Sequence, residues 1–131
     1  MSERRAFQYA VLRAVPRVDR GECVNVGVLL YCQDAGYLAV AVHLDEDRVR
    51  ALDPTVDLDA VRAALDGVRA VCAGTDGVPA ASWPVRDRFG WLTAPRSTVV
   101  QAGPVHSGVT EDPDAQLQRL LTRLVLPNAS A

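Results

Sequence analysis

The C-terminal third of the chain holds a cluster of side chains that can bind an anion. Its members are Arg88, Arg96, Ser97, Thr98 and His106. Guanidinium groups and hydroxyls donate hydrogen bonds to phosphate or carboxylate oxygens, and an imidazole can act as an acid or a base near neutral pH. These five residues are therefore the candidate ligands of an anion or nucleotide. No Gly-rich phosphate loop, GxSxG turn or HExxH pair accompanies them, so the catalytic residues of any reaction stay unassigned.

A second interpretation of the same cluster needs no ligand. Trp83, Phe89 and Trp91 are interleaved with its arginines, Arg86 included. The aromatic residues would then belong to the core, and the arginines would form a solvated rim. The two interpretations differ in one respect, which is whether Arg88, Arg96 and His106 converge on a single pocket.

A second set of polar residues surrounds the first predicted turn. Residues 20–22, Arg-Gly-Glu, are predicted to close a β-hairpin, because glycine tolerates the backbone angles of tight turns. In the preceding strand, alternation puts Arg13 on the same face as the apolar residues. A guanidinium on an apolar face needs a partner, and Glu22 is the candidate. We interpret this pair as architectural. The alternative is that Arg13 or Arg20 binds an anion that Glu22 orients.

The strand after this turn carries an unusual pair, Asn25 and Gly27. Strict alternation puts both on one face and the apolar residues 24, 26, 28 and 30 on the other. A glycine in a strand leaves room for a helix, a loop or a ligand to approach the backbone. A supporting, structural role is the favoured interpretation of both residues.

The cysteines and histidines are too scattered to predict a metal site or a cofactor. Cys23, Cys32 and Cys72 form no CxxC pair, and neither His43 nor His106 stands at ligand spacing from another candidate on one element. We predict no metal, no cofactor and three reduced, mostly buried thiols.

The elements that must position these residues begin with three strands. Residues 7–15, 23–32 and 37–43 are apolar and rich in β-branched or aromatic residues, and turn residues separate them. They predict an antiparallel meander. Residues 86–103 are expected to be irregular and to run into a fourth strand near 98–101, with residues 104–113 as a loop.

Helices are predicted after the meander and at the end of the chain. A short helix should end before Pro54, and a terminal helix should begin with Asp112 as N-cap and Pro113 at its first position. Between them, one helix has an apolar face of residues at intervals of three and four: Leu58, Val61, Leu65, Val68 and Cys72. Residues 73–84 form a loop. The predicted class is α+β, an antiparallel sheet of about four strands with two or three helices packed on one face.

Composition limits the classes of protein to which the chain can belong. With 131 residues, 49% hydrophobic and 23% charged, it is expected to form one soluble domain over 1–131, with 128–131 as a disordered tail. It lacks a secretory signal pattern, so we expect a cytoplasmic protein without a membrane anchor. The net charge of −2 disfavours nucleic acid, although arginines gather near the N-terminus.

Four segments in order carry a family resemblance. YAVLRAVP, RGECVNVGVLLY, RFGWLTAPRST and VHSGVTEDP, followed by a leucine-rich helix, resemble the bacterial domain of unknown function 3037 family. The most specific parts are Arg-Gly-Glu-x-x-Asn-x-Gly at 20–27 and Arg-Phe-x-Trp-Leu-x-Ala with the following Ser-Thr at 88–98. The family has no established activity. Its members are often encoded beside a HipA-like kinase-fold protein, so the resemblance implies such a protein as a partner.

Two functional hypotheses follow. The first is a non-catalytic accessory or interaction module, with a HipA-like kinase-fold protein as a possible partner. The second is a small anion- or nucleotide-binding domain, or an enzyme, that uses the C-terminal Arg/Ser/His cluster on a phosphate-containing ligand. The sequence indicates neither the ligand nor the oligomeric state.

Overall fold

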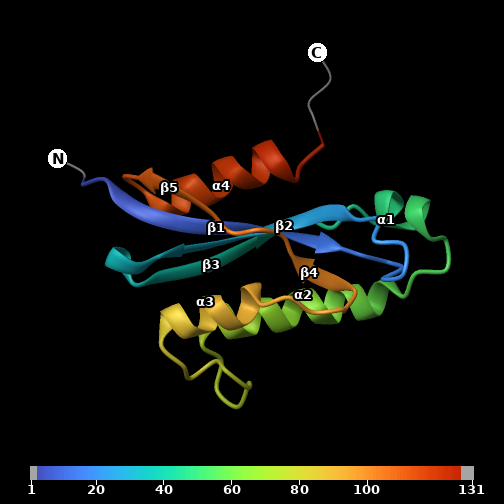
Figure 1. Ribbon diagram of the computed structural model, residues 1–131, viewed down its shortest axis with the longest axis horizontal. Helices are drawn as coiled ribbons and strands as arrows, with labels where there is room; N and C mark the ends of the chain where they lie inside the picture. Colours follow the sequence, from blue (N-terminus) through green and yellow to red (C-terminus); the bar gives the residue numbers. More distant parts are fainter. Residues whose placement is uncertain (1–2, 128–131) are drawn as a thin grey trace.

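One antiparallel sheet organises the chain. The structure, a computed structural model, describes residues 3–127, which form five strands and four α-helices (Figure 1). The predicted α+β class is confirmed. In chain order the elements are β1 (Arg5–Ala14), β2 (Val24–Cys32), a 3-10 turn (Gln33–Ala35), β3 (Tyr37–Val42), α1 (Glu46–Leu52), α2 (Leu58–Ala73), α3 (Val85–Thr93), β4 (Val100–Ala102), β5 (His106–Thr110) and α4 (Pro113–Leu124). The tail predicted at 128–131 lies outside the described residues.

The first three strands form the predicted meander, and two more strands extend it beyond β1. The order is β3-β2-β1, with β4 pairing residues 12–14 of β1 and β5 pairing residues 5–9. Around Pro104 the edge is interrupted, although the Gly103 N–H still donates to the Val11 carbonyl at 2.8 Å. The prediction of a loop over residues 104–113 was wrong. Ser, Gly and His have weak strand preferences, but the free hydrogen-bonding edge of β1 recruits them into β5.

A β-bulge in β2 breaks the alternation that the sequence predicts. Leu12 pairs with Gly27 but Arg13 pairs with Asn25, so Val26 has no partner on β1. An extra residue of this kind shifts the following side chains to the other face of the sheet.

The bulge distributes the apolar residues of β2 between two cores. Val24 and Val26 pack with the side chains of α2, whereas Val28 and Leu30 pack with those of α4. The prediction of one common face for these four residues was therefore wrong. Both faces of β2 are buried, which makes it the central strand of the core.

Helices cover both faces of the sheet. In Figure 1, α4 lies on one side, and α2 and α3 lie on the other. The sequence analysis placed the predicted helices on one face, whereas the predicted long helix, α2, and the predicted terminal helix, α4, cover opposite faces of the sheet. The prediction of irregular structure before residue 98 missed α3. Its Phe89 and Leu92 are one turn apart and pack against Tyr31 and Val71, so tertiary burial stabilises a helix whose sequence lacks a strong apolar stripe.

Aspartate caps mark where three helices begin. The side chains of Asp45, Asp57 and Asp112 each accept a hydrogen bond from the backbone N–H three residues later. The start predicted for the terminal helix at Pro113 is confirmed, as is the end of α1 before Pro54. Within residues 3–127 no helix is long and apolar enough to cross a bilayer.

A hydrogen bond between β3 and α4 makes the fold less stable at alkaline pH. The Tyr37 hydroxyl donates to Asp114 Oδ1 at 2.6 Å, and burial together with this carboxylate raises the pKa of Tyr37 above its ordinary value of 10.0. Because the folded pKa exceeds the unfolded one, the stabilisation is complete below pH 10 and is lost as the pH rises further. We expect urea midpoints to fall more between pH 9 and pH 11 for the wild type than for Tyr37→Phe. Equal pH dependence in the two proteins would contradict this.

Candidate functional site

Arg88 connects the end of α2 to the beginning of α3. Its Nη1 donates to the carbonyls of Val71 and Cys72, both at 3.0 Å, and its Nε donates to the carbonyl of Trp83 at 2.9 Å. The last carbonyls of a helix have no partner within the helix, and a cation at this end also interacts favourably with the helix dipole. The donors of this predicted anion ligand are thus directed at the backbone.

His106 lies on the other face of the sheet from the arginines. It pairs with Tyr9 across β1 and β5, and the two ring centroids are 5.2 Å apart. Tyr9 packs on the core that contains α4, and cross-strand neighbours share a face. Arg96, in contrast, lines a cavity with Leu92 on the side of α2 and α3. The structure therefore does not bring Arg88, Arg96 and His106 to one pocket.

Arg96, Ser97 and Thr98 do lie together, at the entry to β4. The Arg96 guanidinium is stacked over Trp91, with 4.6 Å between its Cζ and the ring centroid, and it donates to the Trp91 carbonyl. The Thr98 hydroxyl donates to the Val100 carbonyl at 2.7 Å. Of the five predicted ligands, Arg96 and Ser97 line the same shallow polar pocket.

The predicted ion pair of Arg13 and Glu22 does not form. Glu22 Oε1 instead lies 2.5 Å from Nε of Arg20, an exposed contact that lowers the pKa of Glu22. The hairpin connection spans residues 15–23, too many for the tight turn on which the prediction rested. Arg13 lies over Gly103, where a Cβ would be 2.8 Å from Arg13 Cζ. Its neighbour is therefore the β4 edge.

Asn25 and Gly27 have structural partners on opposite faces. Asn25 Nδ2 donates to the Leu124 carbonyl at 3.1 Å, which satisfies the C-terminal end of α4. At Gly27 a Cβ would lie 2.8 Å from the Ala41 carbonyl oxygen and 3.5 Å from Leu12, on the side of α2. The prediction of a shared face was wrong because the bulge at Val26 separates the two residues.

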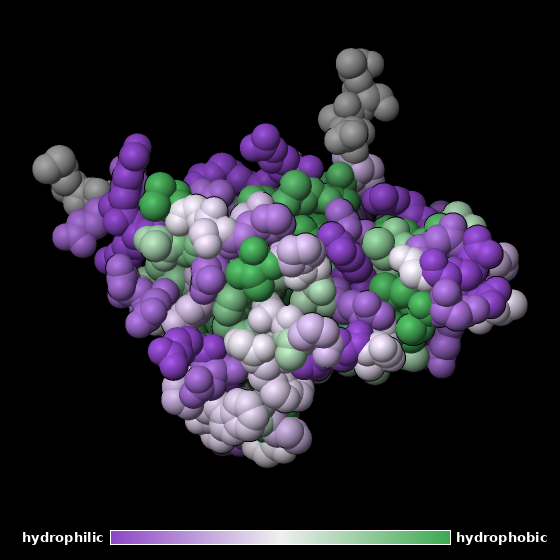
Figure 2. Space-filling model, in the orientation of Figure 1, coloured by the Kyte–Doolittle hydropathy of each residue, from purple (hydrophilic) through white to green (hydrophobic). Residues whose placement is uncertain are grey.

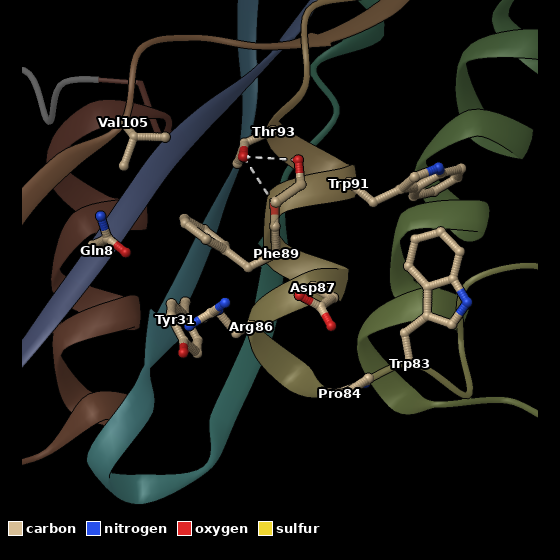
Figure 3. A pocket seen from close by; sticks show the side chains of 11 residues that line it. Gln8, Tyr31, Trp83, Pro84, Arg86, Asp87, Phe89, Trp91, Thr93 and Val105 are labelled. Carbon is tan, nitrogen blue, oxygen red and sulfur yellow. Dashed lines mark hydrogen bonds between the residues drawn. The ribbon is translucent and has the colours of Figure 1, made fainter.

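An open groove of about 940 Å³ runs along α3, and the sequence analysis did not predict it. Figure 3 shows Trp83 and Trp91 on the same side of the helix, with Phe89 on the other side facing the sheet. We call this surface the α3 groove. Its remaining lining is Gln8, Tyr31, Pro84, Arg86, Asp87, Gly90, Thr93 and Val105.

The two tryptophans of the chain line the α3 groove and are exposed to solvent. Trp83 is 45% exposed and Trp91 is 37% exposed, so they are not the core residues that the second interpretation expected. Phe89 is buried and stacks on Tyr31, with 5.1 Å between centroids. The protruding loop that leads into α3 has intermediate hydropathy in Figure 2. The exposed tryptophans thus lie on the opposite side of α3 from the buried pair of Phe89 and Tyr31.

Comparison with known proteins adds a family to this geometry. The pattern of the family described as "Protein of unknown function (DUF3037)" matches residues 9–125. The chain belongs to the DUF3037 family. No curated protein and no solved structure matches it.

In this DUF3037 chain the motif residues have identifiable structural partners. Three of these motif residues support the fold. The side chain of Arg88 donates to a carbonyl at the C-terminal end of α2, and that of Asn25 does the same at the C-terminal end of α4. Gly27 leaves room for the backbone of β3. The motifs therefore support the fold on which the α3 groove is built. Within residues 3–127 no group of three or more His, Cys, Asp or Glu side chains is placed to hold a metal ion.

The three thiols differ in their accessibility. Cys23 is exposed, Cys32 is buried and Cys72 is partly buried, and desolvation raises the pKa of Cys72 to about 12. Because the thiolate is the reactive form, we expect iodoacetamide at pH 8 to modify Cys23 at least about a hundredfold faster than Cys72. Mass spectrometry of the time course measures this. Rapid modification of a Cys23→Ser variant would contradict the prediction.

Proposed function

We propose that this protein is a non-catalytic interaction module that binds a partner protein through the α3 groove. The observation that supports the proposal is the exposure of Trp83 and Trp91 beside one open groove. Tryptophan is enriched at protein interfaces and among the residues that contribute most to binding. The few charges nearby, Arg86 and Asp87, suit the rim of such a contact.

The proposed partner is a HipA-like kinase-fold protein, met in the cytoplasm. This part of the proposal rests on the family resemblance, because the groove itself indicates only a protein surface with apolar side chains. Arg86 makes no side-chain hydrogen bond or ion pair with the described residues, so its guanidinium is available to a carboxylate of the partner.

Co-expression with the HipA-like kinase-fold protein of the same genome tests the proposal. We expect a complex that persists through size exclusion, and a dissociation constant at least about a hundredfold higher for the double variant Trp83→Ser/Trp91→Ser. The matched control is Val18→Ser, since Val18 is 44% exposed but lies in the β1–β2 connection. Absence of a complex, or equal effects of the two variants, would contradict the proposal.

The alternative function, an anion-binding enzyme, keeps support from Arg96 and Ser97 alone. Arg88 donates to backbone carbonyls and His106 lies on the opposite face. An acid or base at His106 would have to act on a different surface from the arginine that binds the anion. For this reason the interaction module is the function that we propose.

A further inference from the structure

An apolar cavity lies between α2 and β4. It has a volume of about 380 Å³ and opens at one side. The loop before α3 contributes part of its wall through Val78 and Pro79. The larger apolar side chains that line it from the sheet and the helices are Leu12, Val68, Val71, Trp91, Leu92 and Val100. Apolar pockets of 300 to 1,000 Å³ with a few placed polar groups are the usual form of small-molecule sites.

A glycine in the middle of α2 keeps the rim of this cavity open. Gly67 lines the cavity, and a Cβ built on it meets no atom within 4 Å. Glycine inside a helix is about 1 kcal/mol less favourable than alanine. At position 67 the helix thus carries a residue that lowers its stability, where a larger side chain would reach over the cavity.

A fixed cation stands at the mouth of the cavity. Arg96 lines both the cavity and the polar pocket that contains Ser97 and Gln101. The face of its guanidinium is stacked on Trp91, and one nitrogen donates to the Trp91 carbonyl. No carboxylate of residues 3–127 forms an ion pair with it. A guanidinium has five N–H donors, so most of its donors are available to a ligand.

The geometry points to a binding site for an amphiphilic monoanion, a medium-chain carboxylate. Its alkyl chain occupies the cavity, and its carboxylate accepts hydrogen bonds from Arg96 and the Ser97 hydroxyl. A volume of about 380 Å³ holds roughly a dozen water-sized groups, which fits a chain of about six to ten carbons. The site goes beyond the proposed function and does not depend on it.

Calorimetric titration with sodium octanoate tests this site. We expect octanoate to bind, and acetate, which has the carboxylate without the chain, to bind at least about a hundredfold more weakly. Arg96→Gln should weaken octanoate binding at least about tenfold and leave the affinity for octanol, the uncharged analogue, within about twofold. Absence of octanoate binding at millimolar concentration overturns the proposal. Unchanged octanoate binding by Arg96→Gln also overturns it.

Filling the cavity provides the second test. Gly67→Leu should remove both octanoate and octanol binding, and Ala64→Leu, one turn earlier on the same wall, should do the same if the first variant fails to fold. The matched control is Gly90→Leu. Gly90 is a helical glycine whose Cβ would also meet no atom within 4 Å, but it lies outside this cavity. Octanoate binding that survives both filling variants, or that the control also removes, overturns the assignment.

Discussion

Gly27→Ala is expected to lower the free energy of unfolding by about 3 kcal/mol, near the upper end for a single added methyl group. The added Cβ would lie 2.8 Å from the carbonyl oxygen of Ala41. That oxygen belongs to the backbone of β3, which pairs with β2 from Gly27 to Cys32. It cannot move without separating the edge strand β3 from the buried strand β2.

Substitution of a second glycine distinguishes a clash with the backbone from a clash with a movable side chain. At Gly103 a Cβ would also approach to 2.8 Å, but to the guanidinium of Arg13. That group is the end of a flexible side chain and can move away, so Gly103→Ala should cost less than about 1 kcal/mol. Urea denaturation of both variants measures the difference. Equal losses would show that the Ala41 carbonyl is not the decisive contact.

Arg88→Met is expected to lower the free energy of unfolding by about 3 kcal/mol. The variant removes the side-chain donor of three carbonyls: the part-buried ones of Val71 and Cys72 and the exposed one of Trp83. Among the described residues, the Val71 carbonyl keeps only the Gly74 N–H, at 3.2 Å. Hydrogen bonds to a charged group contribute about 1.5 to 3 kcal/mol each, and not additively. Arg88→Lys should recover only part of the loss, because one ammonium cannot reach carbonyls on both sides of the planar guanidinium.

The adjacent helical arginine provides the control. Arg86→Met removes the same type of side chain from α3, at an exposed position with no side-chain hydrogen bond to a described residue. Its free energy of unfolding should stay within about 0.5 kcal/mol of the wild type. Similar losses for the two variants would mean that the three carbonyls find other partners when Arg88 is removed.

Local signals in the sequence were sufficient for the meander and for most helices. Apolar runs divided by turn residues predicted β1 to β3. The Asp112–Pro113 pair predicted where α4 begins, and its cap is present. These features depend on residues close together in the chain, where periodicity and capping act.

The candidate site depended on contacts that the sequence does not display. Arg88 is a good anion ligand by type, yet its donors are taken by carbonyls of α2 that lie 16 and 17 residues earlier. His106 and Arg96 are ten positions apart, but the pairing of β5 with β1 puts them on opposite faces. Whether the tryptophans belong to a binding surface or to the core was left open by the sequence, because tryptophan is common in both, and only the packing shows that both are exposed.

By itself the sequence determined the fold class, the order of the first three strands, the start of α4 and membership of the DUF3037 family. Only the tertiary structure decided the rest. The bulge at Val26 sets which side chains of β2 meet α2 and which meet α4. Burial of Phe89 and Leu92 makes α3 a helix, and that helix creates the groove with its exposed tryptophans. The physical reason is that strand register and helix placement depend on packing between residues far apart in the chain, where propensity and periodicity carry no information.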